Sequence, residues 1–365
     1  MKYKRMAIEI EAPEESGAHI QYNLSESSTT DRTLHSLGLQ LPDLTLLYTE
    51  HRGTTRLRQL IVEGTTLQPD DVLVTAGAAG ALFIIATSQL SAGDHLLVMR
   101  PNYASNLETP RATGCDISFI DLQMEDKYQP NLADIEAAIR PNTKLISITC
   151  PHNPTGTNIS LQSLKDIVAL AKRKGCLLLV DETYHEIHYG HQLPIAASLG
   201  NHVISVSSMS KSWGLPGIRI GWLITQNKDL QTTFLAAKEQ ISISGSVIDE
   251  WIAEQILSRK AELIPAANKE MAERRSIVEA WVEEEPLVEW VKPVGGAVCF
   301  PRMKEEPIGG TAAFYDRLLQ KYSTYVGLGH WFERPDTHFR IGFGWPSQEE
   351  LRQGLENISK ALRDQ

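Results

Sequence analysis

Short apolar runs alternate with helical segments along the first two thirds of the chain. The runs are continuously apolar, which is typical of strands buried on both faces. They lie at residues 72–75, 95–99, 116–120, 144–148, 177–180, 202–206 and 218–225, and helical periodicity marks residues 78–89 and 161–174. This order predicts an α/β fold with a mostly parallel sheet between two layers of helices. Ligands of such sheets bind at the carboxyl ends of the strands.

The pattern changes after about residue 244. One long, charged stretch at residues 247–285 has helical periodicity, and shorter elements follow it: strands at 287–291, 297–301 and 337–343, and helices at 311–321 and 348–363. These elements predict a second, smaller α/β domain. We expect a large domain over residues 43–250 and a small C-terminal domain over residues 251–365. Residues 1–42 are too few for a domain of their own and are expected to pack on the small one.

Composition narrows the class of protein. The chain has 365 residues, of which 42% are hydrophobic and 22% charged, as in ordinary globular proteins. Its net charge of −10 argues against a nucleic-acid partner, which would need a basic face. No apolar run approaches the length of a membrane span, and no signal-peptide core follows the basic N-terminus. The four cysteines form no C-x-x-C pair, so we expect free thiols, a cytoplasmic location and no membrane partner.

The stretch at residues 207–222, SSMSKSWGLPGIRIGW, contains the most informative lysine of the chain. Lys211 follows Ser208 and precedes Arg219 by eight residues. A lysine in a dry, electropositive site loses its proton easily and can form an imine with an aldehyde. Serine and arginine are suited to a phosphate group. The combination indicates pyridoxal 5'-phosphate, an aldehyde that carries a phosphate, although the segment alone is more typical of a surface turn.

Two further strand ends carry residues that suit this cofactor. Ala78 and Ala79 lie where a strand turns through small residues into a helix, and the N-terminus of a helix attracts anions. Asp181 ends a leucine-rich strand, where a carboxylate is costly unless a cation pairs with it. A protonated pyridine nitrogen is such a cation. Taken singly, the first feature is an ordinary strand-to-helix turn and the second a helix cap.

Four polar or aromatic residues extend the pattern. Tyr103 lies just past a strand and could stack on a planar ring, and Asn153 lies in an Asn-Pro-Thr-Gly turn and could donate to a ring oxygen. Tyr184 could donate to the same oxygen. Arg340 lies in an alternating strand and is a candidate clamp for a carboxylate. Each also has a simpler interpretation, as a core or surface tyrosine, a turn residue or an arginine at the surface.

Together these motifs, from about Tyr48 to Gly344, resemble the class I/II aminotransferases of the fold-type I pyridoxal-phosphate enzymes. The resemblance implies a mostly parallel, seven-stranded type of sheet and pyridoxal 5'-phosphate as cofactor. It also implies a transaminase that moves an amino group between an amino acid and a 2-oxo acid.

The resemblance also implies a role for each residue. Lys211 would bind the cofactor as an imine and then carry a proton between the substrate's α-carbon and the cofactor's C4' atom. Asp181 would pair with the pyridine nitrogen. The other implied contacts are the ring hydroxyl with Asn153 and Tyr184, the ring face with Tyr103, the phosphate with Ala78, Ala79, Ser208 and Arg219, and the substrate's α-carboxylate with Arg340.

A tyrosine near the start of the large domain implies a dimer. Residues 48–58, YTEHRGTTRLR, are similar to the family's Tyr…Gly…Leu-Arg stretch. In relatives this tyrosine reaches the phosphate of the neighbouring subunit. The resemblance therefore implies a homodimer in which Tyr48 completes the partner's active site.

The N-terminal segment departs from the family pattern. Many relatives have a glycine-containing stretch that closes over the substrate, whereas this chain has YNLSESS at residues 22–28. Glu26 would lie near the substrate's side chain. One hypothesis is that Glu26 selects a cationic or amine-bearing substrate by charge pairing, and the alternative is a solvated loop glutamate.

Other functions fit the sequence less well. A metal site at Asp181, His185, His188 and His191 is disfavoured because no cysteine is near and Asp181 suits the ring nitrogen better, so we expect no metal. Elimination, replacement or cyclisation at an amino acid side chain would use the same machinery and stays an alternative. A non-catalytic cofactor-binding regulator would need an added DNA-binding domain, and the enzyme core fills these 365 residues. No G-x-G-x-x-G follows the first strand, which disfavours a dinucleotide-binding protein.

Overall fold

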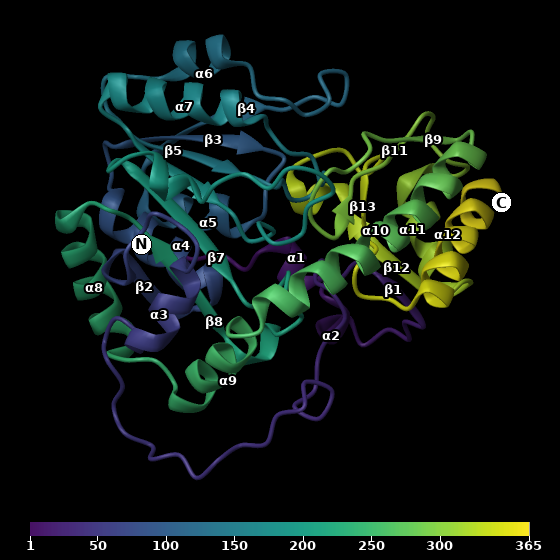
Figure 1. The fold of residues 1–365 in the computed structure, drawn as a ribbon. Helices are drawn as coiled ribbons and strands as arrows, with labels where there is room; N and C mark the ends of the chain where they lie inside the picture. The colour runs from purple at the N-terminus through teal and green to yellow at the C-terminus, as the bar shows by residue number, and fades with distance from the viewer. Residues whose placement is uncertain (365) are drawn as a thin grey trace.

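A seven-stranded sheet forms the centre of the larger half of the molecule (Figure 1). The computed structural model describes residues 1–364, apart from the side chain of Ser16. In spatial order the strands are β2 (Val72–Ala76), β8 (Ile220–Ile224), β7 (Val203–Ser208), β6 (Leu177–Asp181), β5 (Thr143–Thr149), β3 (His95–Arg100) and β4 (Asp116–Asp121). Only β8 runs opposite to its neighbours. The predicted mostly parallel α/β sheet is therefore confirmed.

Helices cover both faces of this sheet, which explains why its strands are continuously apolar. The face packed by α4 (Gly77–Gln89), α5 (Ser105–Thr113) and α8 (Lys228–Ser242) receives Leu179 of β6, and the opposite face receives Leu178 and Val180. That opposite face is covered by α6 (Leu132–Ala138) and α7 (Leu161–Lys174). Successive strand residues point to opposite faces, so each needs an apolar side chain.

The smaller half is built on a four-stranded sheet. Its spatial order is β1 (Tyr22–Leu24), β12 (Thr324–Leu328), β13 (Phe339–Gly342) and β10 (Val298–Cys299), and a separate pair joins β9 (Val288–Glu289) to β11 (Arg302–Met303). The helices α11 (Gly310–Gln320) and α12 (Gln348–Arg363) pack against it. Strand β1 pairs in parallel with β12, so a segment near the N-terminus forms an edge of this C-terminal sheet. The boundaries at residues 42 and 250 stay a prediction.

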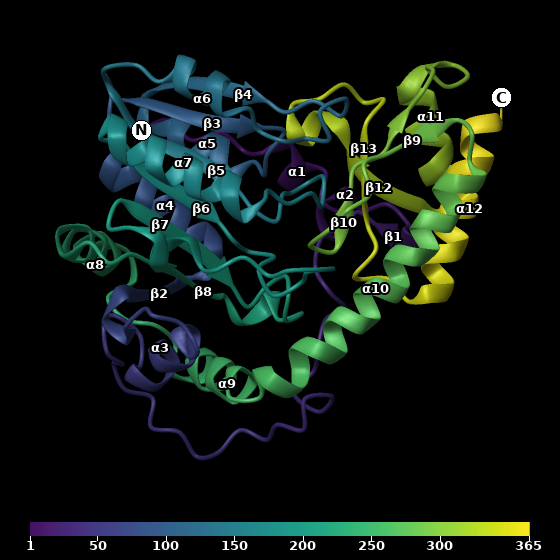
Figure 2. The same ribbon diagram turned by 45° about the horizontal axis from the view of Figure 1, so that its top comes forward.

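One long helix connects the two halves. The predicted helix over residues 247–285 is in fact two, α9 (Val247–Leu257) and α10 (Lys260–Glu284). The break lies at Ser258 and Arg259, where the Arg259 side chain donates to the Leu37 carbonyl oxygen at 3.0 Å. The turn lets α9 pack on α3 (Thr55–Val62) while α10 crosses to the smaller half (Figure 2). Hydrophobic periodicity alone does not reveal such a turn.

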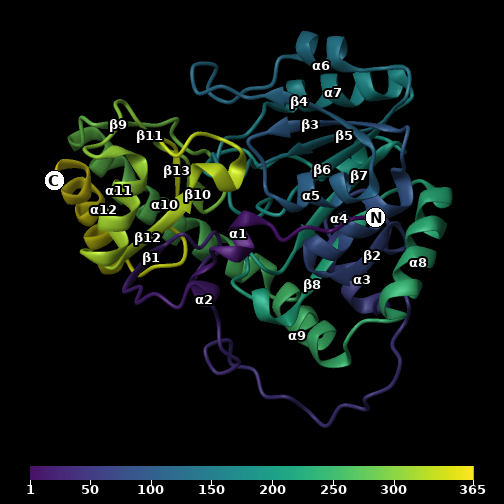
Figure 3. The ribbon, with the colours of Figure 1, turned by 180° about the vertical axis from the view of Figure 1, so that it is seen from behind.

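The N-terminal segment passes between the two halves before β1. It carries the short helices α1 (Ala7–Ile10) and α2 (Pro13–Ser16), and α1 lies at the junction of the halves when the molecule is seen from behind (Figure 3). After β1 the chain runs in a long irregular stretch around the outside of the large half to α3. None of the described helices is both long and apolar enough to cross a membrane.

The packing of β6 on α7 yields a prediction about stability. The Leu178 side chain is 0% exposed in the core, whereas Leu161 at the start of α7 is 40% exposed. We expect Leu178→Ala to lower the free energy of unfolding by about 2–5 kcal/mol, because it leaves a cavity between sheet and helix. Leu161→Ala, the matched control, should change it by less than about 1 kcal/mol. Chemical denaturation would measure both, and equal effects would contradict this packing.

Candidate active site

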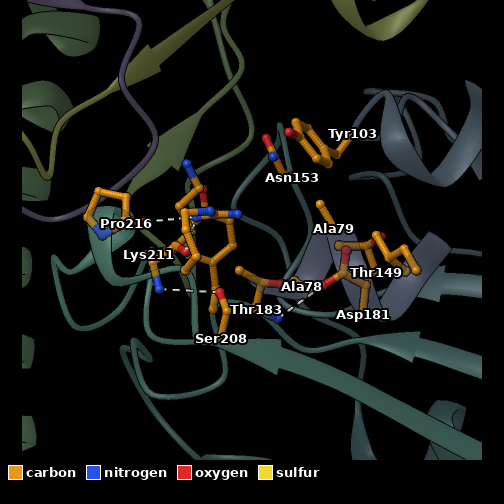
Figure 4. Close-up of a pocket in the computed structure, with 14 residues that line it drawn as sticks. Ala78, Ala79, Tyr103, Thr149, Asn153, Asp181, Thr183, Ser208, Lys211 and Pro216 are labelled. Carbon is orange, nitrogen blue, oxygen red and sulfur yellow. Dashed lines mark hydrogen bonds between the residues drawn. The ribbon is translucent and has the colours of Figure 1, made fainter. Parts of the chain in front are cut away.

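A pocket opens at the carboxyl ends of the central strands, where the topology predicts a ligand. Its lining comes from segments that follow β2, β3, β5, β6 and β7. Polar groups from these segments converge on one space (Figure 4). Nine of the predicted residues line it: Ala78, Ala79, Tyr103, Asn153, Asp181, Tyr184, Ser208, Lys211 and Arg219.

One end of the pocket is suited to an anion. Helix α4 begins here, and the first backbone N–H groups of a helix have no partner within it. Gly77 has a φ of 70°, and a Cβ on it would overlap the Arg219 guanidinium, so glycine permits the close approach. Arg219 donates to the Ser210 hydroxyl at 3.4 Å but pairs with no carboxylate of the described residues. A cation beside a free helix N-terminus fits a phosphate group.

The opposite end holds a buried carboxylate. Asp181 accepts hydrogen bonds from the Thr183 hydroxyl at 2.6 Å and from the Asn106 amide at 3.0 Å. Burial raises the pKa of Asp181, and these two hydrogen bonds oppose that rise. Among the described residues no lysine, arginine or histidine pairs with the carboxylate. A protonated ring nitrogen would supply the missing cation, so the donor set fits pyridoxal phosphate.

Lys211 lines the same pocket. Its carbonyl oxygen accepts hydrogen bonds from the Thr29 N–H at 3.0 Å and from the Thr29 hydroxyl at 3.1 Å, which fix its backbone. Burial lowers the pKa of the Lys211 amine, while the nearby carboxylates of Glu26 and Glu9 act to raise it. A lowered pKa increases the fraction of free amine, which is the form that attacks an aldehyde.

Asn153 and Tyr184 approach the middle of the pocket. The Asn153 Oδ1 atom accepts from the Arg340 guanidinium at 3.2 Å, which leaves its Nδ2 atom available as a donor. The Tyr184 hydroxyl donates to the Ser27 carbonyl oxygen at 2.6 Å. Because its proton is used in that bond, the Tyr184 hydroxyl can accept a hydrogen bond from a ring hydroxyl in the pocket but cannot donate one to it, whereas the sequence predicted donation.

Tyr103 lies over the pocket and contacts the N-terminal segment. Its hydroxyl donates to Glu9 Oε1 at 3.3 Å. Burial raises the pKa of Tyr103 to about 12. The tyrosine therefore stays neutral at ordinary pH and presents an aromatic ring to any planar group below it.

The remaining three predicted residues lie outside the pocket lining. Arg340 is buried at its edge, where it also donates to the Ser25 carbonyl oxygen at 2.6 Å. Glu26 is half-buried on the adjacent loop. Tyr48 is 76% exposed in the irregular stretch before α3, beside residues 242–248 and away from Lys211.

Sequence reasoning missed several side chains that complete the site. Asn106 is the main one, because it joins Asp181 to a buried polar network through the Asn102 side chain. Thr149, Thr183 and Ser210 also line the pocket. Asn106 follows Tyr103 by three residues near the start of α5, and this proximity in sequence was the only available signal. Within the described residues, no three His, Cys, Asp or Glu side chains gather as metal ligands.

Known proteins resemble this chain over nearly its whole length. The model of the family "Aminotransferase class I and II" matches residues 28–358. Capreomycidine synthase of Streptomyces vinaceus is 28% identical over 314 residues, which cover 85% of this chain and 79% of that protein. Aspartate aminotransferase of Pyrococcus horikoshii is 26% identical over 325 residues, which cover 86% and 83%.

A solved structure agrees with these sequence matches. The crystal structure of a pyridoxal-phosphate-dependent aminotransferase from Streptococcus suis superposes with a TM-score of 0.91 at 28% identity, covering 100% of this chain and 98% of that one. The match thus includes both halves of the molecule and the pocket between the strand ends. The chain therefore belongs to the class I and II aminotransferase family, and it is a pyridoxal 5'-phosphate-dependent transaminase.

Proposed function

We propose that this transaminase works through the cage around Lys211, with the roles that the sequence resemblance implies. The observation that carries the proposal is that a buried carboxylate without a cationic partner, Asp181, and a half-buried lysine, Lys211, line the same pocket. When bound, pyridoxal 5'-phosphate supplies an aldehyde for amino groups and a ring that accepts electrons. The described residues have distinct tasks around that group.

The phosphate end is the anchor in this proposal. The N-terminus of α4 at Ala78 and Ala79, with Ser208 and Arg219, would hold the phosphate by backbone N–H groups, a hydroxyl and a guanidinium. Asn153 and Tyr184 would hold the ring hydroxyl, and Tyr103 would cover the ring face. These contacts would turn the aldehyde of the bound group toward Lys211.

Lys211 would first bind the aldehyde carbon and later act as the base. Its amine, released when an amino acid takes its place, can remove the proton from the substrate's α-carbon and deliver it to the neighbouring C4' position. Burial favours the neutral amine for the first task. Asp181 would keep the ring nitrogen protonated and so increase the electron demand at the α-carbon.

Arg340 would hold the substrate's α-carboxylate. It is buried, it is fixed by Asn153 and the Ser25 carbonyl oxygen, and its Nε atom has no partner among the described residues. A free donor on a buried guanidinium is costly and fits an incoming carboxylate.

A second candidate reaction is cyclisation or elimination at the substrate's side chain. It is favoured by the similarity to the solved structure of a pyridoxal-phosphate-dependent cyclase, which superposes with a TM-score of 0.89 at 26% identity. The two are separated by mixing the purified enzyme with one amino acid and no acceptor. Accumulation of the pyridoxamine form supports transamination, whereas release of ammonia and a keto acid supports elimination.

Exposed apolar residues support the proposed homodimer. Leu46, Leu47 and Tyr48 are all exposed on the irregular stretch, and Ile248 is exposed beside them. A contiguous exposed apolar patch is typical of a surface that another protein covers. A second copy of the chain there would bring Tyr48 to the phosphate of its partner's site. We also propose a cytoplasmic location, in keeping with the four free cysteines.

The role of Lys211 is tested by substitution. We expect Lys211→Ala to lose the visible absorbance of covalently held cofactor and its trapping by borohydride, because no other lysine among the described residues lines the pocket. Lys304→Ala, at an exposed position, is the control and should keep both signals. Spectroscopy and peptide mass mapping would measure them, and a cofactor trapped on a different lysine would contradict the proposal.

The role of Asp181 is tested by removing its charge. Because an unpaired buried ion costs about 3 kcal/mol or more, we expect Asp181→Asn to slow the half-reaction with an amino acid at least roughly 100-fold. Stopped-flow absorbance would measure the rate. Asp116→Asn, an exposed acid, serves as control. An Asp181→Asn enzyme that reacts as fast as the parent would refute the pairing.

The role of Tyr48 is tested in the dimer. Loss of a hydrogen bond to a charged group weakens binding by roughly tenfold, so Tyr48→Phe should raise the Kd of pyridoxal phosphate by about that factor. Tyr3→Phe, another exposed tyrosine, should leave the Kd unchanged. Cofactor titration would give the Kd, and sedimentation would report the oligomeric state. A monomer in solution, or an unchanged Kd, would exclude the shared site.

A further inference from the structure

Two carboxylates approach the pocket from the N-terminal segment. Glu9, on α1, accepts a hydrogen bond from the Tyr103 hydroxyl at 3.3 Å, and Tyr103 lines the pocket. Glu26 follows Ser25, whose carbonyl oxygen accepts from Arg340. Both carboxylates are close enough to Lys211 for their charges to raise its pKa. Glu9 therefore lies beside the pocket-lining Tyr103, and Glu26 follows the residue that fixes Arg340 at the edge of the pocket.

Neither acid has a cationic partner of its own. Among residues 1–364, no lysine, arginine or histidine lies within 4.0 Å of the Glu9 or Glu26 carboxylate. Glu9 is exposed and Glu26 half-buried, so a molecule entering the pocket can reach both. No third ligating residue joins them within the described part of the chain, which argues against a metal ion. Neither acid therefore forms an ion pair among the described residues, although the Glu26 carboxylate is near enough to Lys211 and Arg340 to affect their pKa values.

Arg340 indicates, independently of the two acids, where a ligand would bind. Arg340 is 2% exposed, and its Nε atom lacks a hydrogen-bond partner among the described residues. An unpaired donor in a buried guanidinium fits an acidic group of a ligand. With an α-carboxylate on Arg340 and an α-amino group at Lys211, the side chain of an amino acid is left to face the remaining wall, near Glu26 and Glu9.

The position of Glu9 is fixed by the contacts of Glu11, two residues further along the chain. The Trp331 indole N–H donates to Glu11 at 2.7 Å, and the His330 ring lies 3.0 Å from the same carboxylate. Tyr325 donates to the Glu11 carbonyl oxygen at 2.7 Å. These three contacts dock the end of α1 on the smaller half and so hold Glu9 over Tyr103.

We propose that Glu9 and Glu26 select amino acids with a cationic side chain. A guanidinium or ammonium group would pair with both carboxylates, one on α1 and the other on the loop after β1. This inference rests on the proposed function, because it requires an amino acid bound through Arg340 and Lys211. The sequence predicted such a role for Glu26 alone, and the structure adds Glu9 as a second acid that determines specificity.

The experiment compares substrates that differ mainly in charge. Arginine and citrulline have nearly the same shape, and lysine and norleucine form a second pair. The holoenzyme is mixed with each amino acid, and the rate of the cofactor's absorbance change is followed against concentration. We expect kcat/KM for arginine or lysine to exceed that of its neutral counterpart at least tenfold, and high salt should reduce this ratio.

Variants assign the preference to the two acids. Glu9→Gln and Glu26→Gln should each lower the cationic-to-neutral ratio of kcat/KM several-fold. Glu14→Gln, an exposed acid on the same segment, should leave the ratio unchanged.

Two results would overturn the inference: a parent enzyme without preference for the cationic amino acids, or a ratio that both variants leave unchanged. A failure of every amino acid to change the cofactor spectrum would instead refute the proposed function itself.

Discussion

The structure of the site depends on one electrostatic constraint, the burial of the Asp181 carboxylate without a cation of its own. Burial of an unpaired charge costs several kcal/mol, and three hydrogen bonds from neutral groups offset only part of that cost. A pocket that contains such a carboxylate is therefore selective for a ligand that brings a positive charge to that point. The other end of the same pocket, at Arg219 and the start of α4, has the opposite requirement. A ring with a cationic nitrogen at one end and a phosphate at the other satisfies both.

The fold explains how distant segments meet these two requirements. Asp181 ends β6 and Ser208 ends β7, and these strands are parallel neighbours, so their carboxyl ends meet at one edge of the sheet. Strand β2 is separated from β7 only by β8, and β8 runs backward from Arg219. Because β8 is antiparallel to β2, its first residue, Ile220, pairs with Ala76, the last residue of β2. Arg219 therefore lies beside the start of α4. The antiparallel β8 is thus part of how the phosphate end is assembled.

Most strands of the central sheet could be predicted from the sequence, and the same physical reasons explain which strands could not. Continuous apolar runs such as Leu177–Asp181 are evident because both faces of the central sheet are buried. The strand β12 was not predicted, since TYVGL contains glycine and is only partly buried, and its partner β1 is remote in sequence. The two-residue strands β9 and β10 were predicted as longer, because apolar residues continue beyond the paired ones.

The site shows the same division. Residues at strand ends, such as Asp181 and Lys211, could be named because the position of a strand end in a parallel sheet implies a position in space. Asn106 and Glu9 could not, because their closeness to the pocket arises from packing of a helix and from docking of the N-terminal segment. Such contacts leave no periodic signal in the sequence.

The central claim is that Asp181 keeps the cofactor's ring nitrogen protonated. The ¹⁵N chemical shift of pyridoxal phosphate labelled at that nitrogen, bound to the enzyme, tests this claim directly. The account predicts a protonated nitrogen from pH 6 to pH 9 in the parent enzyme and a neutral one in Asp181→Asn at the same neutral pH. A neutral ring nitrogen in the parent enzyme at pH 7 would contradict it.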